Sequence, residues 1–229
     1  MKIRLFPLIK FFLFSLIAFL ITSCVKTDNL DFDTKVRFIN AIDQKPQDFY
    51  LNNLKSATSI SYNNNSEYVV AAGNNEYTVS AKTTGTQSLS STSKYLFSVG
   101  KNYSVYYHKK SEADSVLHIL EDNLTPDTAN ARLFFINLGY TLNSRVSIRN
   151  EDSVSLNNIT LGNGENSGYI KMPVGKNSKL YFNLIDSTQV IDTISYTNFF
   201  KGKTYTIIID GVNKGPNKGK LRERLIVNN

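Results

Sequence analysis

From about residue 34 onward, apolar and polar side chains alternate along the chain with a period of two. The alternation is clearest over residues 77–82, 102–107 and 179–184. A period of two is typical of strands that bury one face. Such runs recur about every 8–12 residues, and clusters of Asn, Gly and Ser separate them, as in a β-sandwich. Because no stretch after the first 33 residues keeps the helical period of 3.6, the sequence predicts an all-β fold.

The strand pattern occurs twice along the chain. Residues 36–40 (VRFIN) correspond to 133–137 (LFFIN), and residues 100–106 (GKNYSVY) correspond to 202–208 (GKTYTII). The motifs keep their order in both copies, so the sequence predicts two tandem copies of one domain. The boundaries that we expect are a first repeat over residues 34–126 and a second over 127–229.

These motifs resemble a bacterial family called domain of unknown function 4397. The resemblance rests on the VRFIN and LFFIN starts, on the Gly-Lys-x-Tyr strands and on an Ala-Gly or Val-Gly turn before an alternating strand, and it covers about residues 35–228. It implies a secreted or lipid-anchored protein of Bacteroidetes type, with two tandem Ig-like antiparallel β-sandwich domains. The family assigns no activity. Asp43, Pro46 and Asp48 follow the first copy's opening strand, as is common in the family, whereas the second copy lacks them.

Gly100 and Gly202 occupy equivalent places in the two copies, each before a lysine and a strand. Glycine adopts a positive φ without steric cost, and tight turns before strands often need one. We therefore expect a positive φ at both glycines.

The N-terminus has the composition of a secretory signal. Lys2, Arg4 and Lys10 precede the apolar run 11–21 (FFLFSLIAFLI), which is too short to span a bilayer. The sequence Ile-Thr-Ser-Cys then ends at Cys24, the chain's only cysteine, and resembles a bacterial lipobox. This predicts that residues 1–23 are removed as a lipoprotein signal peptide and that Cys24 is lipidated. The alternative is a free thiol in a leader or membrane anchor.

Two further predictions follow from this reading of the N-terminus. Residues 24–33 are polar after the cysteine and should form a tether. The residue after Cys24 is Val25 and not aspartate. In similar lipoproteins a residue other than aspartate at this position is compatible with delivery to the outer membrane. We therefore expect the protein at the outer membrane or cell surface.

The net charge of +7 is concentrated at the two ends of the chain. The leader carries +3, and residues 214–224 carry five basic side chains against Glu223; the rest holds 18 basic and 18 acidic residues (26 − 3 − 5 and 19 − 1). A neutral body argues against nucleic acid as a partner. The candidate ligand contacts in the basic tail are Lys218, Lys220, Arg222 and Arg224. They could contact anionic lipopolysaccharide or acidic glycans, or they could protect an edge strand from pairing.

The sequence offers little for catalysis. His108 and His118 are the only histidines, and a hairpin centred on Ala113 could place them opposite each other. Two ligands alone make a weak metal site, and the preferred interpretation is two hydrophilic side chains beside a loop. We interpret the acidic pairs Glu121–Asp122 and Glu151–Asp152 as solvated charges in loops. We therefore expect no enzyme activity, no cofactor and no metal.

Tyr106 is a candidate for ligand contact. Tyr103, Val105 and Tyr107 occupy alternate positions of one predicted strand, so Tyr106 points to the other face. An exposed tyrosine can stack on a sugar ring or join an interface. The alternative is that Tyr106 fills a half-buried sheet face.

The chain contains several triplets in which Asp is followed by Ser or Thr and then by a small or apolar residue. This pattern resembles the O-glycosylation sequon of Bacteroidetes, although Asp and Ser also favour turns. The candidate acceptors are Ser115, Thr128, Ser153, Ser187 and Thr193.

Together these features predict a non-enzymatic outer-membrane or cell-surface lipoprotein that is a structural or ligand-binding module. Two alternatives stay open: a glycan-binding accessory protein of a nutrient-uptake system, and an adhesin or surface-assembly component. The expected partners are the membrane, through the N-terminal lipid, and a glycan or an envelope protein. The sequence leaves the ligand and the oligomeric state open.

Overall fold

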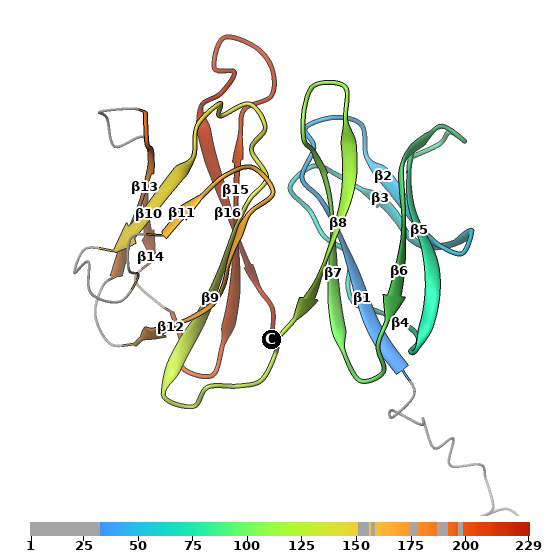
Figure 1. Cartoon of the computed structure of the whole chain (residues 1–229), viewed down its shortest axis with the longest axis horizontal. Coiled ribbons are helices and arrows are strands. Elements are labelled where there is room, and N and C mark those ends of the chain that lie inside the picture. Colours follow the sequence, from blue (N-terminus) through green and yellow to red (C-terminus); the bar gives the residue numbers. More distant parts are fainter. Residues whose placement is uncertain (1–32, 151–155, 157–158, 175–177, 187–191, 197–198) are drawn as a thin grey trace, which may run out of the picture. The chain divides into compact units, whose positions relative to one another are not determined.

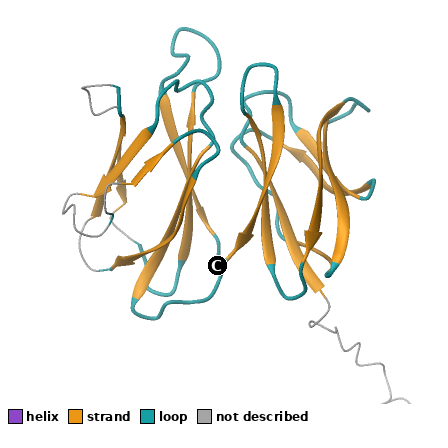
Figure 2. Ribbon diagram, in the orientation of Figure 1, coloured by secondary structure: helices purple, strands orange, loops and turns teal. Residues whose placement is uncertain are grey.

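The computed structural model describes residues 33–150, 156, 159–174, 178–186, 192–196 and 199–229. These residues form strands, turns and loops, with no helix among them (Figure 2). The described part of the chain accordingly has no helix of the length and apolarity needed to cross a bilayer. Residues 32–229 form one compact unit, so the two repeats belong to a single body.

Each repeat supplies its own set of strands (Figure 1). The first repeat contributes β1 (Asp33–Asn40), β2 (Gln47–Leu51), β3 (Leu54–Ile60), β4 (Val69–Ala72), β5 (Asn75–Thr83), β6 (Leu89–Phe97), β7 (Asn102–Lys109) and β8 (Ser115–Asp122). The second contributes β9 (Asn130–Asn137), β10 (Val146–Asn150), β11 (Ile159–Leu161), β12 (Asn166–Pro173), β13 (Ser178–Leu184), β14 (Asp192–Tyr196), β15 (Thr204–Gly211) and β16 (Leu221–Val227).

The strands of each repeat form two sheets that pack as a sandwich. In the first repeat the sheet orders are β4-β1-β7-β8 and β3-β2-β5-β6. In the second they are β12-β9-β15-β16 and β11-β10-β13-β14. The predicted all-β sandwich is therefore confirmed. One detail differs from a purely antiparallel arrangement: β1 pairs with β7, and β9 with β15, in parallel. The finer Ig-like assignment stays a prediction.

Each sandwich has its own apolar core between its two sheets. In the first, Phe38 of β1 stacks on Phe49 of β2 with ring centroids 5.0 Å apart. In the second, Phe135 of β9 and Phe182 of β13 approach to 6.2 Å. These positions come from the alternating pattern, because every second residue of a strand points into the sandwich. Neither core includes a residue of the other repeat.

A third apolar cluster joins the two repeats. It contains Ile39 of β1 and Tyr106 of β7 from the first repeat together with Ile136 of β9 and Ile208 of β15 from the second. The sheets β4-β1-β7-β8 and β12-β9-β15-β16 therefore pack against each other as well as against their own partner sheets. Their central strands are buried on both faces, and β15 is buried along its whole length. Such strands lose the alternating pattern and become continuous apolar runs, as IleIleIle at 207–209 shows.

The cluster corrects the prediction made for Tyr106. The residue does point away from the core of its own sandwich, as the alternation predicts. Its side chain is nevertheless fully buried, because the second repeat covers that face. Tyr106 is thus an interface residue and is inaccessible to a ligand.

The positive φ expected at the two equivalent glycines is confirmed. Gly100 has a φ of 70° and Gly202 a φ of 78°. A Cβ at either position would meet no atom within 4 Å, so the requirement for glycine lies in the backbone alone.

Candidate functional site

Loops from both repeats are connected at one end of the unit. We call this set the loop end: the β7–β8 turn (110–114), the loop 138–145, the turn 162–165 and the β15–β16 loop (212–220). Glu112 of the first repeat accepts a hydrogen bond from the Tyr140 hydroxyl at 3.1 Å and lies 3.7 Å from Lys218 Nζ. The Tyr140 hydrogen bond, followed by the charge of Lys109, lowers the pKa of this exposed carboxylate. The contacts fix loops of one repeat against those of the other.

The first of two concave sites at the loop end, hollow 1, has a volume of about 410 Å³. Its walls come from β6, from the β7–β8 hairpin and from the turn 162–165 of the second repeat. The lining residues are Ser93, Tyr95, His108, Lys110, Val116, Leu117, His118, Ile119, Asn163, Gly164 and Glu165. Both repeats thus contribute to one hollow.

The two histidines lie side by side in hollow 1. They are diagonal neighbours and not direct partners, because Tyr106 pairs with His118 and His108 with Val116. The hairpin is therefore centred one residue before Ala113. The imidazole centroids are 5.9 Å apart. Burial, followed by the charge of His118, lowers the pKa of His108 to about 4, so its ring is neutral at pH 7.

Metal binding by these histidines gains no further support from their surroundings. Among the residues that the structure describes, no group of three His, Cys, Asp or Glu side chains is placed to hold an ion. Lys110 also lowers the pKa of His118, after the larger contribution of burial. A nearby ammonium group opposes a bound cation in the same way that it opposes a bound proton.

Hollow 2, the second concave site, has a volume of about 510 Å³. The β15–β16 loop and the start of β16 form most of it, and the segment after β3 in the first repeat closes one side. The lining residues are Tyr62, Asn63, Val212, Lys214, Pro216, Asn217, Lys220, Leu221, Arg222 and Glu223. Three cationic side chains, one carboxylate (Glu223), amides and apolar groups therefore face the same space.

The floor of hollow 2 is a hydrogen-bonded group that spans both repeats. The Tyr62 hydroxyl donates to Asp210 Oδ2 at 2.6 Å, and the Arg222 guanidinium lies 4.7 Å from the centre of the Tyr62 ring. Arg222 also donates to Asp210 Oδ1 at 3.3 Å and lies 3.6 Å from Asp43. Burial raises the pKa of Asp210, and the hydrogen bond from Tyr62 opposes that shift. Tyr62 and Asp210 are 148 residues apart, so no local motif indicates this group.

The structure separates the four residues of the predicted basic patch. Lys218 and Lys220 are exposed on the β15–β16 loop. Arg222 and Arg224 are on β16, where they pair with Asp210 and Ile208 across the sheet. Cross-strand partners share a face, and Ile208 belongs to the apolar cluster between the repeats. Both arginines therefore point toward the first repeat, which corrects the prediction of one exposed patch. The strand β16 lies at the edge of its sheet, and protection of that edge by the basic residues stays a prediction.

Of the two arginines, Arg224 has the less expected environment. Its Nε and both terminal nitrogens are buried and have no hydrogen-bond partner among the described residues. Burial lowers the pKa of its guanidinium to about 10. A charge held in this way is costly, and it is unavailable to an external ligand.

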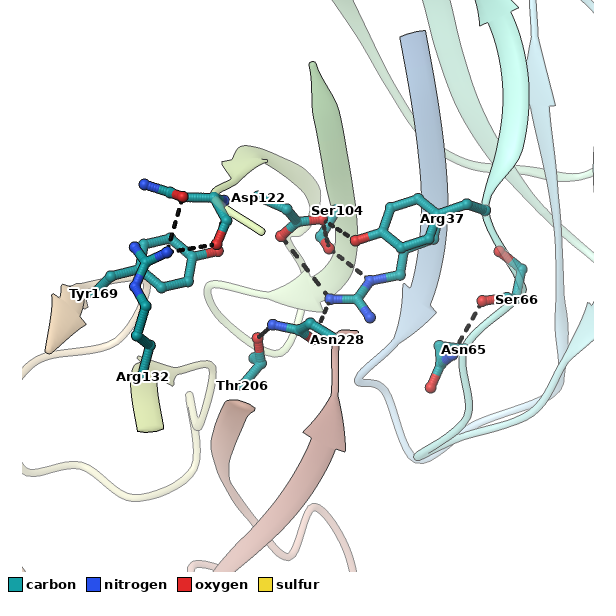
Figure 3. Close-up of polar contacts among 11 residues, drawn as sticks. Arg37, Asn65, Ser66, Ser104, Asp122, Arg132, Tyr169, Thr206 and Asn228 are labelled. Atoms are coloured by element: carbon teal, nitrogen blue, oxygen red, sulfur yellow. Dashed lines mark hydrogen bonds and ion pairs between the residues drawn. The ribbon is translucent and has the colours of Figure 1, made fainter. Parts of the chain in front are cut away.

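A buried polar network lies beside the apolar cluster (Figure 3). Arg37 Nε donates to Ser104 at 2.8 Å, and an Arg37 terminal nitrogen donates to Asn228 Oδ1 of the second repeat at 2.7 Å. The same guanidinium is 3.9 Å from Asp122, which also accepts from Ser104 at 2.6 Å. Asn228 in turn donates to Thr206 at 2.9 Å. The side chains satisfy one another, so we interpret the network as a structural contact between the repeats.

The remaining sequence candidates fall in different parts of the chain. Ser115 opens β8 and is half-buried, and Thr128 is exposed in the segment between the repeats. Asp127 accepts from the backbone N–H of Ala129 and Asn130, which is ordinary turn chemistry and lowers its pKa to about 2. Thr193 is on β14, of which the structure gives the backbone. The residues Cys24, Ser153 and Ser187 lie outside the described residues.

Comparison with known proteins gives one family. The family described as "Domain of unknown function (DUF4397)" matches residues 34–149, which include the first repeat and the strands β9 and β10 of the second. No curated protein matches the chain.

One similar solved structure is a family 26 carbohydrate-binding module from Eubacterium rectale Amy13K, crystallised with maltoheptaose. It is 10% identical, covers 84% of this chain and 96% of its own, and has a TM-score of 0.29. A likeness at that score carries no argument about a ligand.

Proposed function

The chain belongs to the DUF4397 family of domains of unknown function, and we propose that it is a non-enzymatic, lipid-anchored envelope protein that binds a glycan at its loop end. Anchoring is through Cys24, at the outer membrane or cell surface. The two sandwiches form the body that carries the binding loops.

One observation carries the proposal: residues of both repeats line each hollow of the loop end. Binding sites are commonly concave, of about 300–1,000 Å³, and lie where two domains meet. Both hollows fall in that range and bring together segments far apart in the sequence.

The chemistry of the linings favours a glycan over an apolar small molecule. Hollow 1 combines hydroxyl, imidazole, amide and carboxylate groups with the ring of Tyr95. Hollow 2 combines amides, cations and the Glu223 carboxylate with the ring of Tyr62. Polar groups of this kind exchange hydrogen bonds with sugar hydroxyls, and aromatic rings pack on the apolar faces of sugar rings.

A glycan array on the full chain, purified in detergent, tests this function. We expect binding to a subset of glycans, and weaker binding by a His118→Ala or a Lys220→Ala variant. A Lys94→Ala variant is the matched control, since Lys94 is exposed on β6 and lines neither hollow. If the wild-type chain binds no glycan, the proposal is wrong.

The anchor is tested separately by palmitate labelling in cells. Cys24→Ala should abolish labelling of the chain, whereas Ser23→Ala should retain it. Labelling of the Cys24→Ala variant would remove the anchor from the proposal. The intact mass of the native protein shows in addition whether glycans are attached at the five candidate acceptors.

A further inference from the structure

We propose that hollow 2 binds an anionic saccharide, a sugar that carries carboxylate or phosphate groups. This inference rests on the proposed function and narrows it to one site and one class of glycan. It depends on the charge, the rigidity and the lining of the β15–β16 loop.

The charge of the loop is entirely positive. Residues 212–220 contain Lys214, Lys218 and Lys220 and no acidic residue. Lys218 is 3.7 Å from Glu112, whereas Lys214 and Lys220 line hollow 2 and make no ion pair with any described residue. Both are exposed, so two ammonium groups are available at the rim.

The third cation of hollow 2 has a different role. Arg222 directs its N–H groups to Asp210, to the Gly211 carbonyl oxygen at 3.1 Å and to Asp43. Its charge is therefore compensated within the protein, and it holds the ring of Tyr62 in place. We infer that Arg222 is a positioning residue and that the two lysines supply the charge for the ligand.

Backbone hydrogen bonds and a close contact hold the β15–β16 loop in place. Val212 and Lys220 close it, with Val212 N–H donating to the Lys220 carbonyl at 2.8 Å and Gly219 N–H donating to the Val212 carbonyl at 2.8 Å. Gly219 has a φ of 86°, and a Cβ there would be 3.0 Å from the Thr141 carbonyl oxygen. The loop thus packs closely on the loop 138–145. A site that is already ordered loses less entropy on binding.

The opposite wall of hollow 2 is fixed in the same way. Asn63 N–H donates to the Asn40 carbonyl at 2.9 Å, and Asn40 N–H donates to the Asn64 carbonyl at 3.1 Å. These bonds tie the segment after β3 to the end of β1. The Asn63 side chain is consequently held where it can reach a ligand in the hollow.

The uncharged lining suits a sugar. The carboxamides of Asn63 and Asn217 can each donate and accept hydrogen bonds, as sugar hydroxyls require. Pro216, Val212 and the ring of Tyr62 provide apolar surface between them. A carboxylate or phosphate on the same sugar would receive charge-assisted hydrogen bonds from the lysines.

Isothermal titration calorimetry on the full chain in detergent tests the inference with three probes. Trigalacturonate carries carboxylates, glucose 1-phosphate carries a phosphate, and maltotriose is neutral. We expect at least one anionic probe to bind, maltotriose to bind far more weakly, and the affinity to fall when the ionic strength rises from about 0.02 M to about 0.3 M.

A charge-matched pair of variants assigns the site. The double substitution Lys214→Gln and Lys220→Gln should weaken binding of the anionic probe by about tenfold or more. The control removes two equally exposed lysines from strands away from hollow 2, Lys94→Gln and Lys171→Gln, and should bind like the wild type. Circular dichroism spectra check that both variants are folded.

The outcomes separate this inference from the proposed function. Binding of trigalacturonate or of glucose 1-phosphate that depends on the two lysines supports it and identifies which anionic group is recognised. Equal binding of maltotriose, or anionic binding that the lysine substitutions leave unchanged, would overturn the inference while glycan binding itself stands. If no probe binds and the glycan array is also negative, both proposals fail.

Discussion

At the scale of single residues, the contact between the repeats contains an unusual number of buried charges. The side chains of Arg37 and Asp122 are each 3% exposed, and they form hydrogen bonds with Ser104, Tyr68 and Asn228. Replacement of one partner of such a pair leaves the other charge buried and uncompensated. These residues could not be identified from the sequence, because Asp122 looks like half of a solvated Glu-Asp pair.

Asp122→Ala should therefore destabilise the protein severely. We expect the free energy of unfolding to fall by about 3 kcal/mol, measured by urea denaturation. Glu121→Ala is the matched control: its pair with Lys101 is exposed, and its loss should cost less than about 1 kcal/mol. Similar losses for the two variants would show that the buried network contributes no more to the free energy of unfolding than an exposed ion pair does.

Arg224 provides the opposite case, a guanidinium whose buried nitrogens have no hydrogen-bond partner among the described residues. Arg224→Met keeps much of the side-chain volume and removes the desolvated charge. We expect the free energy of unfolding to rise by about 1 kcal/mol. A loss of that size in the same urea experiment would mean that Arg224 has an interaction that the structure does not reveal.

His108 should make the stability depend on pH. The unfolded chain binds the imidazole proton at about pH 6.5 and the folded chain at about 4. Since the unfolded state binds more protons between these values, this contribution is complete above about pH 6.5 and is lost as the pH falls toward 4.

The difference between wild type and His108→Gln isolates that contribution from those of the carboxylates. We expect the wild type to lose on the order of 2–3 kcal/mol more than the variant between pH 7 and pH 4. Urea denaturation at a series of pH values measures both. Parallel pH profiles would show that the imidazole is not buried in its neutral form.

At the scale of elements, the strands were more predictable than the loops. Alternation locates strands that bury only one face, such as β5 and β13. The preference of glycine for a positive φ locates the turns at Gly100 and Gly202. Alternation also locates β7, although it does not show that the outer face of β7 is covered. It fails for β15, because a second sheet covers its outer face and both faces are buried. The shape of the β15–β16 loop depends on contacts with the loop 138–145 and with Tyr62, and neither is visible in a local sequence window.

Gly100 offers a clean test of the predicted turn. Gly100→Ala should lower the free energy of unfolding by about 1–2 kcal/mol, because its φ of 70° is unfavourable for an L-residue and no other atom is within 4 Å. Gly100→Asn should cost less, since asparagine tolerates this conformation better. Equal costs for the two variants in urea denaturation would contradict a purely backbone origin.

At the scale of the whole molecule, the cluster around Ile39, Tyr106 and Ile208 makes one unit of two similar sandwiches. The internal repeat could be predicted from the sequence, and so could the face of β7 on which Tyr106 lies. The sheet that covers this face could not be predicted, because a solvent-exposed tyrosine and an interface tyrosine fit the same alternation. The same contact produces the hollows, each of which combines side chains from the two repeats. The proposed ligand binding and the assembly of the repeats therefore depend on one interface.

The most direct test of this account is hydrogen–deuterium exchange on the full chain in detergent, with and without saturating trigalacturonate. The account predicts slower exchange on both sides of hollow 2, in the segment around Tyr62 and Asn63 of the first repeat and in the loop 212–220 of the second. The strands of the sandwich cores should be unchanged. Protection confined to one repeat, or no protection at the loop end under saturation, would contradict a binding site shared between the repeats.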